Sequence, residues 1–163
     1  MEHCDECGFD YSSVPADALP DRLRGFGPRY SAGLGAVRDP RRRPAERVWS
    51  PLEYTCHVRD VFRVQRQRLA LALEVDEPEF IPMGRDERAV TEAYNEQDPA
   101  VVLDELGTAA GELADAFDRL GPAELNRTGS YPFPEPQVRT MLWVGRHTVH
   151  EGEHHLLDVR RGG

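Results

Sequence analysis

The chain has 163 residues, of which 39% are hydrophobic and 30% are charged, and this balance predicts a single folded domain. Its formal net charge of −9 repels phosphate backbones, which argues against nucleic acid as a partner. No stretch approaches the roughly 18 consecutive apolar residues of a membrane span, which argues against a membrane as well.

An N-terminal arm, residues 1–15, precedes the expected domain of residues 16–163. The arm is polar and acidic and lacks the basic segment and apolar run of a secretory signal, so we expect a soluble cytoplasmic protein. Three cysteines in such a protein do not make a disulfide framework. The two in the arm, Cys4 and Cys7, therefore raise a question of metal binding or redox chemistry.

The arm sequence Cys4-Asp5-Glu6-Cys7-Gly8 resembles half of a zinc knuckle, in which two thiolates and a turn-permitting glycine hold one side of a tetrahedral site. The second half is missing from the neighbouring sequence, and it can come from the domain only if the arm folds back. Three residues are candidates to complete the site: Cys56, His3 and His147. A redox pair and a pair without a role are the alternatives.

The first two helices of the domain differ in the clarity of their signals. Apolar residues at helical spacing predict a helix over about 23–37 that starts late or kinks near Pro28. The second helix begins at Ser50-Pro51-Leu52-Glu53, which offers a capping serine, a proline at the first position and a glutamate for a capping box. It continues to about Leu73. His57 projects toward its core side, and Asp60 either orients a ligand imidazole or is solvated.

Two further helices complete the pattern. Residues 74–97 show no sustained period and are long enough to cross the whole length of a bundle. A third helix is expected from Asp98-Pro99 to Gly121-Pro122. A proline-rich entry leads to a fourth helix over about 137–160. No convincing strand pattern appears, so the sequence predicts an all-α four-helix bundle with an N-terminal CxxC arm.

The fourth helix carries two stripes at 100° per residue. One is an apolar packing seam in which Gly145 and Gly152 allow a neighbouring helix to come close. The other places three histidines on one face: His147, His150 and His154. Partly buried neighbouring imidazoles repel one another when protonated, and a divalent metal ion removes that problem by binding them in the neutral form. Satisfied structural histidines are the alternative.

Helix geometry limits which histidines can share an ion. Residues seven apart lie about 10.5 Å apart along the axis, so the pair is either His147 with His150 or His150 with His154. His57 is the remaining histidine on a core face, and three His ligands leave a coordination position open for catalysis. His155 is expected at the surface or behind a ligand, where Glu151 can hold it.

Two motifs resemble the DinB-like family of metal-binding four-helix bundles: WSPLEYTCH at residues 49–57 and HEGEHH at residues 150–155. The resemblance extends over about residues 20–160. It implies that His57, His150 and His154 are the metal ligands, with His155 as an alternative to His154. Family members include transferases and isomerases that use mycothiol or bacillithiol, and the 20 basic residues of this chain are all arginine, which fits a GC-rich bacterial host of the mycothiol-using kind.

The function implied by this resemblance is a metal-dependent enzyme that transfers a low-molecular-weight thiol to a small electrophile, or isomerises one. Zinc is the default ion for neutral His ligands, with Ni²⁺, Fe²⁺ and Mn²⁺ as alternatives, and mycothiol is the expected cosubstrate. A carboxylate of the thiol or substrate would be held by an arginine such as Arg59, Arg85 or Arg146. A non-catalytic metal-binding or stress-associated bundle is the alternative, and a homodimer stays open.

Overall fold

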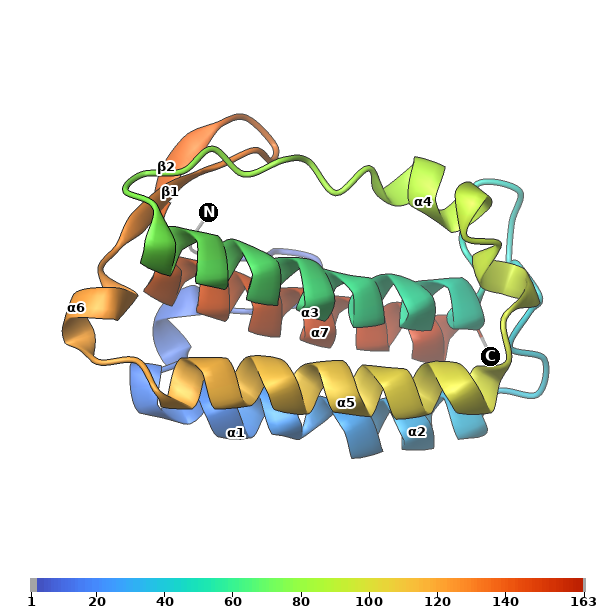
Figure 1. Cartoon of the computed structure of the whole chain (residues 1–163). Helices are drawn as coiled ribbons and strands as arrows, with labels where there is room; N and C mark the ends of the chain where they lie inside the picture. The colour runs from blue at the N-terminus through green and yellow to red at the C-terminus, as the bar shows by residue number, and fades with distance from the viewer. Residues whose placement is uncertain (1–2, 163) are drawn as a thin grey trace.

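The computed structural model describes residues 3–162 and shows four long helical segments packed around one core (Figure 1). The long helices are α1 (Leu19–Arg24) and α2 (Phe26–Gly35), which form one bent segment, α3 (Pro51–Glu74), α5 (Pro99–Asp118) and α7 (Met141–Arg161). The shorter elements are η1 (Tyr11–Ser13), η2 (Ala16–Ala18), α4 (Arg85–Thr91), η3 (Tyr94–Glu96), α6 (Pro122–Leu125), β1 (Thr128–Tyr131) and β2 (Gln137–Thr140). The predicted four-helix bundle is confirmed, while the domain boundary after residue 15 stays a prediction.

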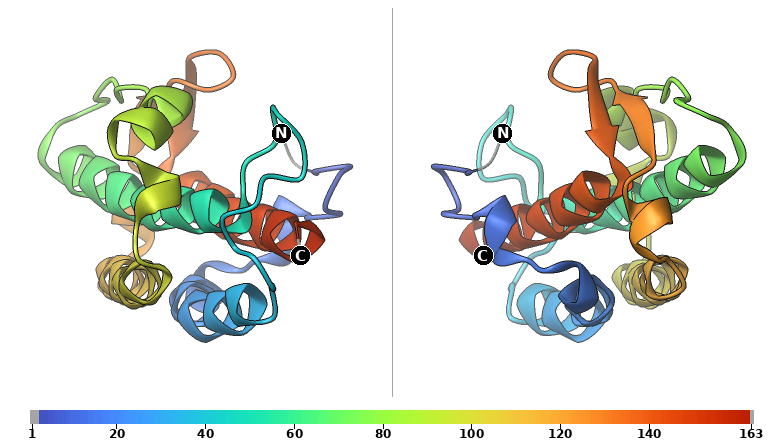
Figure 2. Two further views of the ribbon diagram at one scale, coloured as in Figure 1. Left: turned by 90° about the vertical axis from the view of Figure 1, so that its right-hand side faces the viewer. Right: turned by 90° about the vertical axis from the view of Figure 1, so that its left-hand side faces the viewer.

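Each of the four helical segments packs against two neighbours, which closes the bundle into a ring. α3 packs against α5 and α7, and the bent segment of α1 and α2 packs against the other sides of α5 and α7, as the end-on views show (Figure 2). α3 and α5 run in the same direction, so residues 75–98 return along the length of the bundle between them (Figure 1). The sequence allowed for this crossover. Within residues 3–162, no helix combines the length and the apolar character needed to cross a lipid bilayer.

The bend in the first helical segment lies at Gly25, slightly before the position expected near Pro28. A proline ring clashes with the carbonyl group four residues earlier, which here belongs to Arg24, the last residue of α1. Pro28 itself lies in the first turn of α2, where its missing N–H costs nothing. The helix therefore breaks one turn before the proline.

The predicted start of α3 is confirmed. The backbone N–H of Glu53 donates to the Ser50 hydroxyl at 3.2 Å, and the backbone N–H of Ser50 donates to the Glu53 carboxylate at 2.8 Å. This capping box satisfies two donors that a helix end leaves free. At the start of α5, the Asp98 carboxylate accepts from the backbone N–H of Ala100 at 2.8 Å, again as the sequence indicates.

The predicted start of the fourth helix near Gln137 is wrong. Residues 137–140 form β2, which pairs antiparallel with β1, and α7 begins at Met141 after the capping residue Thr140. The crossover adds to this hairpin, since Phe80 N–H donates to the Ser130 carbonyl at 3.0 Å and Ser130 N–H donates to the Pro78 carbonyl at 2.8 Å. The strands are stabilised by segments far away in the chain, which a short local pattern does not reveal.

The two glycines of α7 allow close packing, as expected. A Cβ atom added to Gly152 would lie 2.4 Å from Phe26 Cζ, and one added to Gly145 would lie 2.8 Å from Leu19 Cδ1. Both contacts are too short for carbon atoms. The close packing against α1 and α2 therefore fixes the rotation of α7 about its own axis. That rotation decides which residues of α7 face α3 and which face the arm.

Gly152→Ala tests this packing. We expect a loss of about 1 to 3 kcal/mol in the free energy of unfolding, because the added methyl group displaces the buried Phe26 ring. Urea unfolding followed by circular dichroism measures it. The matched control is Gly111→Ala on α5, where nothing lies within 4 Å of the added Cβ and the better helix propensity of alanine gains up to about 1 kcal/mol. Equal effects of the two substitutions would contradict the packing argument.

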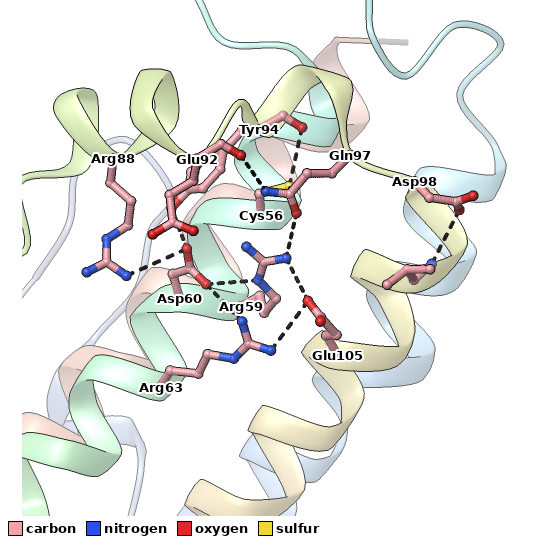
Figure 3. Close-up of polar contacts among 11 residues, drawn as sticks. Cys56, Arg59, Asp60, Arg63, Arg88, Glu92, Tyr94, Gln97, Asp98 and Glu105 are labelled. Carbon is pink, nitrogen blue, oxygen red and sulfur yellow. Dashed lines mark hydrogen bonds and ion pairs between the residues drawn. The ribbon is translucent and has the colours of Figure 1, made fainter.

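A buried ion-pair network connects α3 to α5 and to the crossover (Figure 3). Asp60 accepts from Arg59 Nε at 2.8 Å and from the Tyr94 hydroxyl at 2.6 Å, and Arg59 also donates to Glu105 at 2.8 Å. Asp60 therefore neither orients a ligand imidazole nor lies in solvent. Burial opposes its ionisation, but the hydrogen bonds from Arg59 and Tyr94 prevail and lower the pKa of its carboxyl group.

Asp60→Asn is expected to destabilise the fold by about 3 kcal/mol at neutral pH, because the buried Arg59 guanidinium loses its buried carboxylate partner and keeps only the more exposed Glu105. The lowered pKa means that this contribution is complete above the unfolded-state value near 3.9 and is lost as the pH falls through the lower folded-state value. The difference between variant and wild type should therefore shrink below about pH 4. Asp104→Asn, at an exposed position on α5, is the control. A difference that stays constant into acid would contradict this reading.

Candidate metal centre

The facing sides of α3 and α7 bring three metal-binding side chains together. His57 comes from α3, and Glu151 and His155 lie four residues apart on α7. One carboxylate oxygen of Glu151, Oε2, lies 4.0 Å from His57 Nε2 and 3.6 Å from His155 Nε2. One ligand atom from each residue lies within 4.8 Å of the other two. This group is called the His57 site below.

The protonation states around the His57 site differ from residue to residue. Burial, together with the nearby His155, lowers the pKa of His57 to about 3, so this imidazole is neutral. Burial also acts against a charge on His155, but hydrogen bonds to Asp158 at 2.8 Å and to Glu151 outweigh it and raise its pKa to about 9. Burial would raise the pKa of Glu151, yet the imidazoles of His150 and His155 beside its carboxylate hold that pKa well below its usual range. The site therefore offers a carboxylate anion and a neutral imidazole.

The donor set fits a divalent metal ion. Two histidines and one glutamate are among the ligand sets of catalytic zinc sites, which keep a fourth position open. His57 is only 3% exposed, and its Nδ1 atom has no hydrogen-bond partner within the described chain. The hydrogen bond that His155 Nδ1 donates to Asp158 leaves Nε2 of that ring as the atom that faces Glu151, an arrangement found behind many metal-ligating histidines.

A cavity of about 410 Å³ opens onto the His57 site. α3 and α7 form its floor, and the crossover and the loop between β1 and β2 cover it. Apolar side chains line much of it: Val61, Val64, Met83, Tyr131 and Phe133. Two arginines add positive charge. The Arg85 guanidinium lies 5.2 Å from the centre of the Trp49 ring, and the buried Arg68 donates to the Ile81 carbonyl at 2.6 Å.

The other histidines of α7, His147, His150 and His154, also line this cavity, and they lie on the side of the helix onto which the N-terminal arm folds back. His150 and His154 lie beside Cys4 and Cys7, and the ligand atoms of these four residues lie within 4.8 Å of one another. Nδ1 of His147 forms a 2.8 Å hydrogen bond with the Tyr11 hydroxyl. The His147 ring also stacks on Trp143 with a centroid separation of 4.8 Å.

Comparison with known proteins shows the family of the chain and a similar fold. The sequence model described as the DinB superfamily matches residues 36–159, which include α3 and all but the last two residues of α7. The chain belongs to the DinB superfamily. Its fold is similar to that of YfiT from Bacillus subtilis, a probable metal-dependent hydrolase with an unusual four-helix bundle topology, at a TM-score of 0.78 and 15% sequence identity over 90% of this chain and 86% of that one. No curated protein matches the chain.

The structure divides the ligand set that the DinB resemblance implied. His57 lies with Glu151 and His155, whereas His150 and His154 lie with the arm cysteines. The reason is the helical twist, because each ligand of the second pair is rotated by about 100° from its neighbour in the first. Metal binding by any of these residues stays a prediction. The spacing of four between Glu151 and His155, from which the sequence predicts only that Glu151 holds His155, also suits a pair of ligands on one helix face.

The predicted anion-binding arginines lie in three different places in this DinB bundle. Only Arg85 lines the cavity. Arg59 is bound in the network with Asp60, and Arg146 donates to the Val14 carbonyl at 2.9 Å, where it holds the arm. Sequence reasoning missed Arg68, which lies on the apolar side of α3 and packs 4.9 Å from the centre of the Tyr131 ring.

Proposed function

We propose that the protein is a metal-dependent enzyme whose divalent ion is held at the His57 site. The observation that carries this proposal is the convergence of His57, Glu151 and His155 on the wall of a cavity of about 410 Å³. Three protein ligands leave a coordination position open toward the cavity, as catalysis requires. Zinc is the default for this donor set, and Ni²⁺, Fe²⁺ and Mn²⁺ are compatible with it.

The residues around the site divide the chemical work among them. A divalent ion held by these residues would lower the pKa of a bound thiol or water, so that the thiolate or hydroxide is available as a nucleophile at neutral pH. Asp158 fixes the His155 ring through its Nδ1 atom. Arg68 and Arg85 attract carboxylate groups of the reactants, and the apolar walls around Val61 and Phe133 bind their carbon skeletons and exclude water.

The reaction we favour is transfer of a low-molecular-weight thiol of the mycothiol type to a small electrophile, or an isomerisation that passes through the same addition. This choice rests on the thiol-dependent enzymes among the proteins that the sequence resembles. The thiol proton leaves to solvent and the sulfur forms a bond to the electrophilic carbon. In a transfer, the leaving group departs with the electron pair of the bond that breaks; in an isomerisation, the carbon–sulfur bond breaks again and the thiol is returned with its proton.

Hydrolysis is the second candidate, with water in place of the thiol. Two observations favour it. A set of two histidines and one glutamate is the ligand set of zinc peptidases, which activate water. The structurally similar YfiT is described as a probable metal-dependent hydrolase.

Metal binding at the His57 site is tested through Glu151. Glu151→Gln should lower metal affinity roughly 100-fold, because it removes the anionic ligand, whereas Glu151→His should retain binding by completing a three-histidine set. Isothermal titration of the metal-free protein measures this. Glu153→Gln is the matched control, since Glu153 lies on the same helix and pairs with Arg29. If Glu151→Gln bound the metal with wild-type affinity, Glu151 would not be a ligand and the proposed ligand set would be wrong.

The reaction is tested with the metal-loaded protein, mycothiol and a panel of chlorinated and epoxide electrophiles. We expect consumption of thiol above the metal-free control, with kcat/KM reduced at least roughly 100-fold in His57→Ala. The same panel with ester and amide substrates and no thiol tests hydrolysis. Turnover only in the second arm would replace the transferase with a hydrolase. No metal-dependent turnover in either arm would favour the non-catalytic metal-binding bundle.

A further inference from the structure

The N-terminal arm forms a tight turn around its two cysteines. Cys4 N–H donates to the Phe9 carbonyl at 2.9 Å, and Gly8 N–H donates to the Cys4 carbonyl at 2.8 Å. Gly8 has a φ of +73°, in the left-handed region that favours glycine. The turn therefore holds Cys4 and Cys7 on one side of the chain with both thiols close together, and neither cysteine is bonded in a disulfide.

Two histidines of α7 face this turn. His150 and His154 lie one helical turn apart, and Cys4 Sγ is 3.7 Å from His154 Nδ1. The two thiols and two imidazoles converge, with one ligand atom of each within 4.8 Å of all the others. In a tetrahedral zinc site, bond lengths of about 2.3 Å to sulfur and 2.0 to 2.1 Å to nitrogen place neighbouring ligand atoms about 3.3 to 3.8 Å apart. The separation of Cys4 and His154 lies in that range.

His150 is a buried polar side chain whose hydrogen-bonding groups are left unused. Its side chain is 8% exposed, and neither ring nitrogen has a hydrogen-bond partner in the described part of the chain. Nδ1 is 3.4 Å from a Glu151 oxygen but outside hydrogen-bonding geometry. Native proteins rarely leave a buried imidazole in this state, because desolvation without a partner costs about 1 to 3 kcal/mol. A metal ion between the ring and the arm cysteines supplies the missing partner.

We propose a second metal site, structural and separate from the His57 site, in which one zinc ion is bound by four residues: Cys4, Cys7, His150 and His154. These ligands fill all tetrahedral positions and leave none for a substrate. Two thiolates also balance the two charges of the ion, so the buried centre is neutral. The proposal does not depend on the catalytic function of the bundle.

A carboxylate next to the site supports this assignment. Glu6 lies inside the CxxC turn, and its Oε2 atom is 3.6 Å from His154 Nε2. A carboxylate on the far nitrogen of a ligand imidazole fixes the ring and directs its other nitrogen to the ion. For His154 that other nitrogen is Nδ1, the atom that faces Cys4.

The other candidates for completing the site lie elsewhere. His3 is exposed, with its Nε2 atom 3.6 Å from Asp5 Oδ1, and it is not among the side chains that converge here. His147 Nδ1 is paired with the Tyr11 hydroxyl. Cys56 is buried on α3, where its Sγ atom contacts the Tyr94 carbonyl oxygen at 3.6 Å, and burial raises its pKa to about 12. A redox role for Cys4 and Cys7 would leave the convergence of two histidines on them unexplained.

The consequence of this site is an arm fixed to α7. Phe9 and Tyr11 pack against the His150 ring with centroid separations of 5.4 and 5.5 Å, so the ion and these aromatic contacts hold the same stretch of chain. Binding of His150 and His154 by the second ion also removes them as competitors for the ion at the His57 site. The CxxC arm would thus hold His150 and His154 in the second site and keep them away from the ion at the His57 site.

Cobalt substitution of the full-length protein tests the proposal. We expect the wild-type protein to bind Co²⁺ with an intense thiolate-to-cobalt charge-transfer absorption in the near ultraviolet and the visible bands of tetrahedral Co²⁺. His57→Ala and Glu151→Gln should keep this signature, while Cys4→Ser with Cys7→Ser should lose it and bind one equivalent of metal less. Cys56→Ala is the matched cysteine control and should keep it. The charge-transfer band reports only on the site that contains cysteines. A failure of the proposed second site and a failure of the proposed His57 site would therefore be seen separately.

A measurement on the wild-type chain covers the case in which a variant does not fold. Alkylation by N-ethylmaleimide, read by mass spectrometry, should spare Cys4 and Cys7 in the zinc-loaded protein and modify both after chelation, while the buried Cys56 stays protected. Rapid alkylation of both arm cysteines with zinc bound would overturn the proposal. So would the absence of any thiolate-to-cobalt band in the wild-type protein, or its survival in the double cysteine variant.

Discussion

Successive side chains of α7 point about 100° apart, so residues that are neighbours in the chain face different parts of the molecule. Glu151 and His155 are four residues apart and face α3, while His150 and His154, displaced by one residue, face the arm. One helix therefore carries two pairs of candidate metal ligands with the same spacing and different partners. Each pair is incomplete alone, because a single helix face offers two ligands and a third must come from His57 or from the cysteines.

This division depends on how tightly α7 is held. Gly145 and Gly152 place the apolar side of the helix in direct contact with Leu19 and Phe26, so α7 cannot rotate without a clash. A rotation of α7 by one residue would put His154 opposite α3 in place of His155. The ligands lie on long helices whose packing is fixed by a close backbone approach, which is the kind of support that a metal site needs to keep its geometry. The contacts of Gly145 and Gly152 that stabilise the fold therefore also fix the positions of the side chains at the candidate sites.

The features that the sequence predicts correctly are those encoded locally. The capping box at Ser50 and the start of α5 at Asp98 involve residues within one helical turn. The burial of the His57 side chain is predicted because its own helix shows which side is apolar. The hairpin of β1 and β2 depends on Ser130 meeting the crossover near Phe80, and no local pattern encodes that contact. For the same reason, the sequence points to His150 as the partner of His57, whereas the packing of α3 against α7 places Glu151 beside His57.

The parallel course of α3 and α5 has a direct consequence for the cavity. Because these helices run in the same direction, residues 75–98 must travel back over the bundle, and on the way they supply Met83 and Arg85 to the cavity wall. An antiparallel connection of a few residues would leave the His57 site open to solvent. The ligands thus belong to helices of the core, and part of the cavity wall belongs to a connection on the surface. Changes in the connection can alter which molecules fit while the ligand geometry on α3 and α7 stays the same.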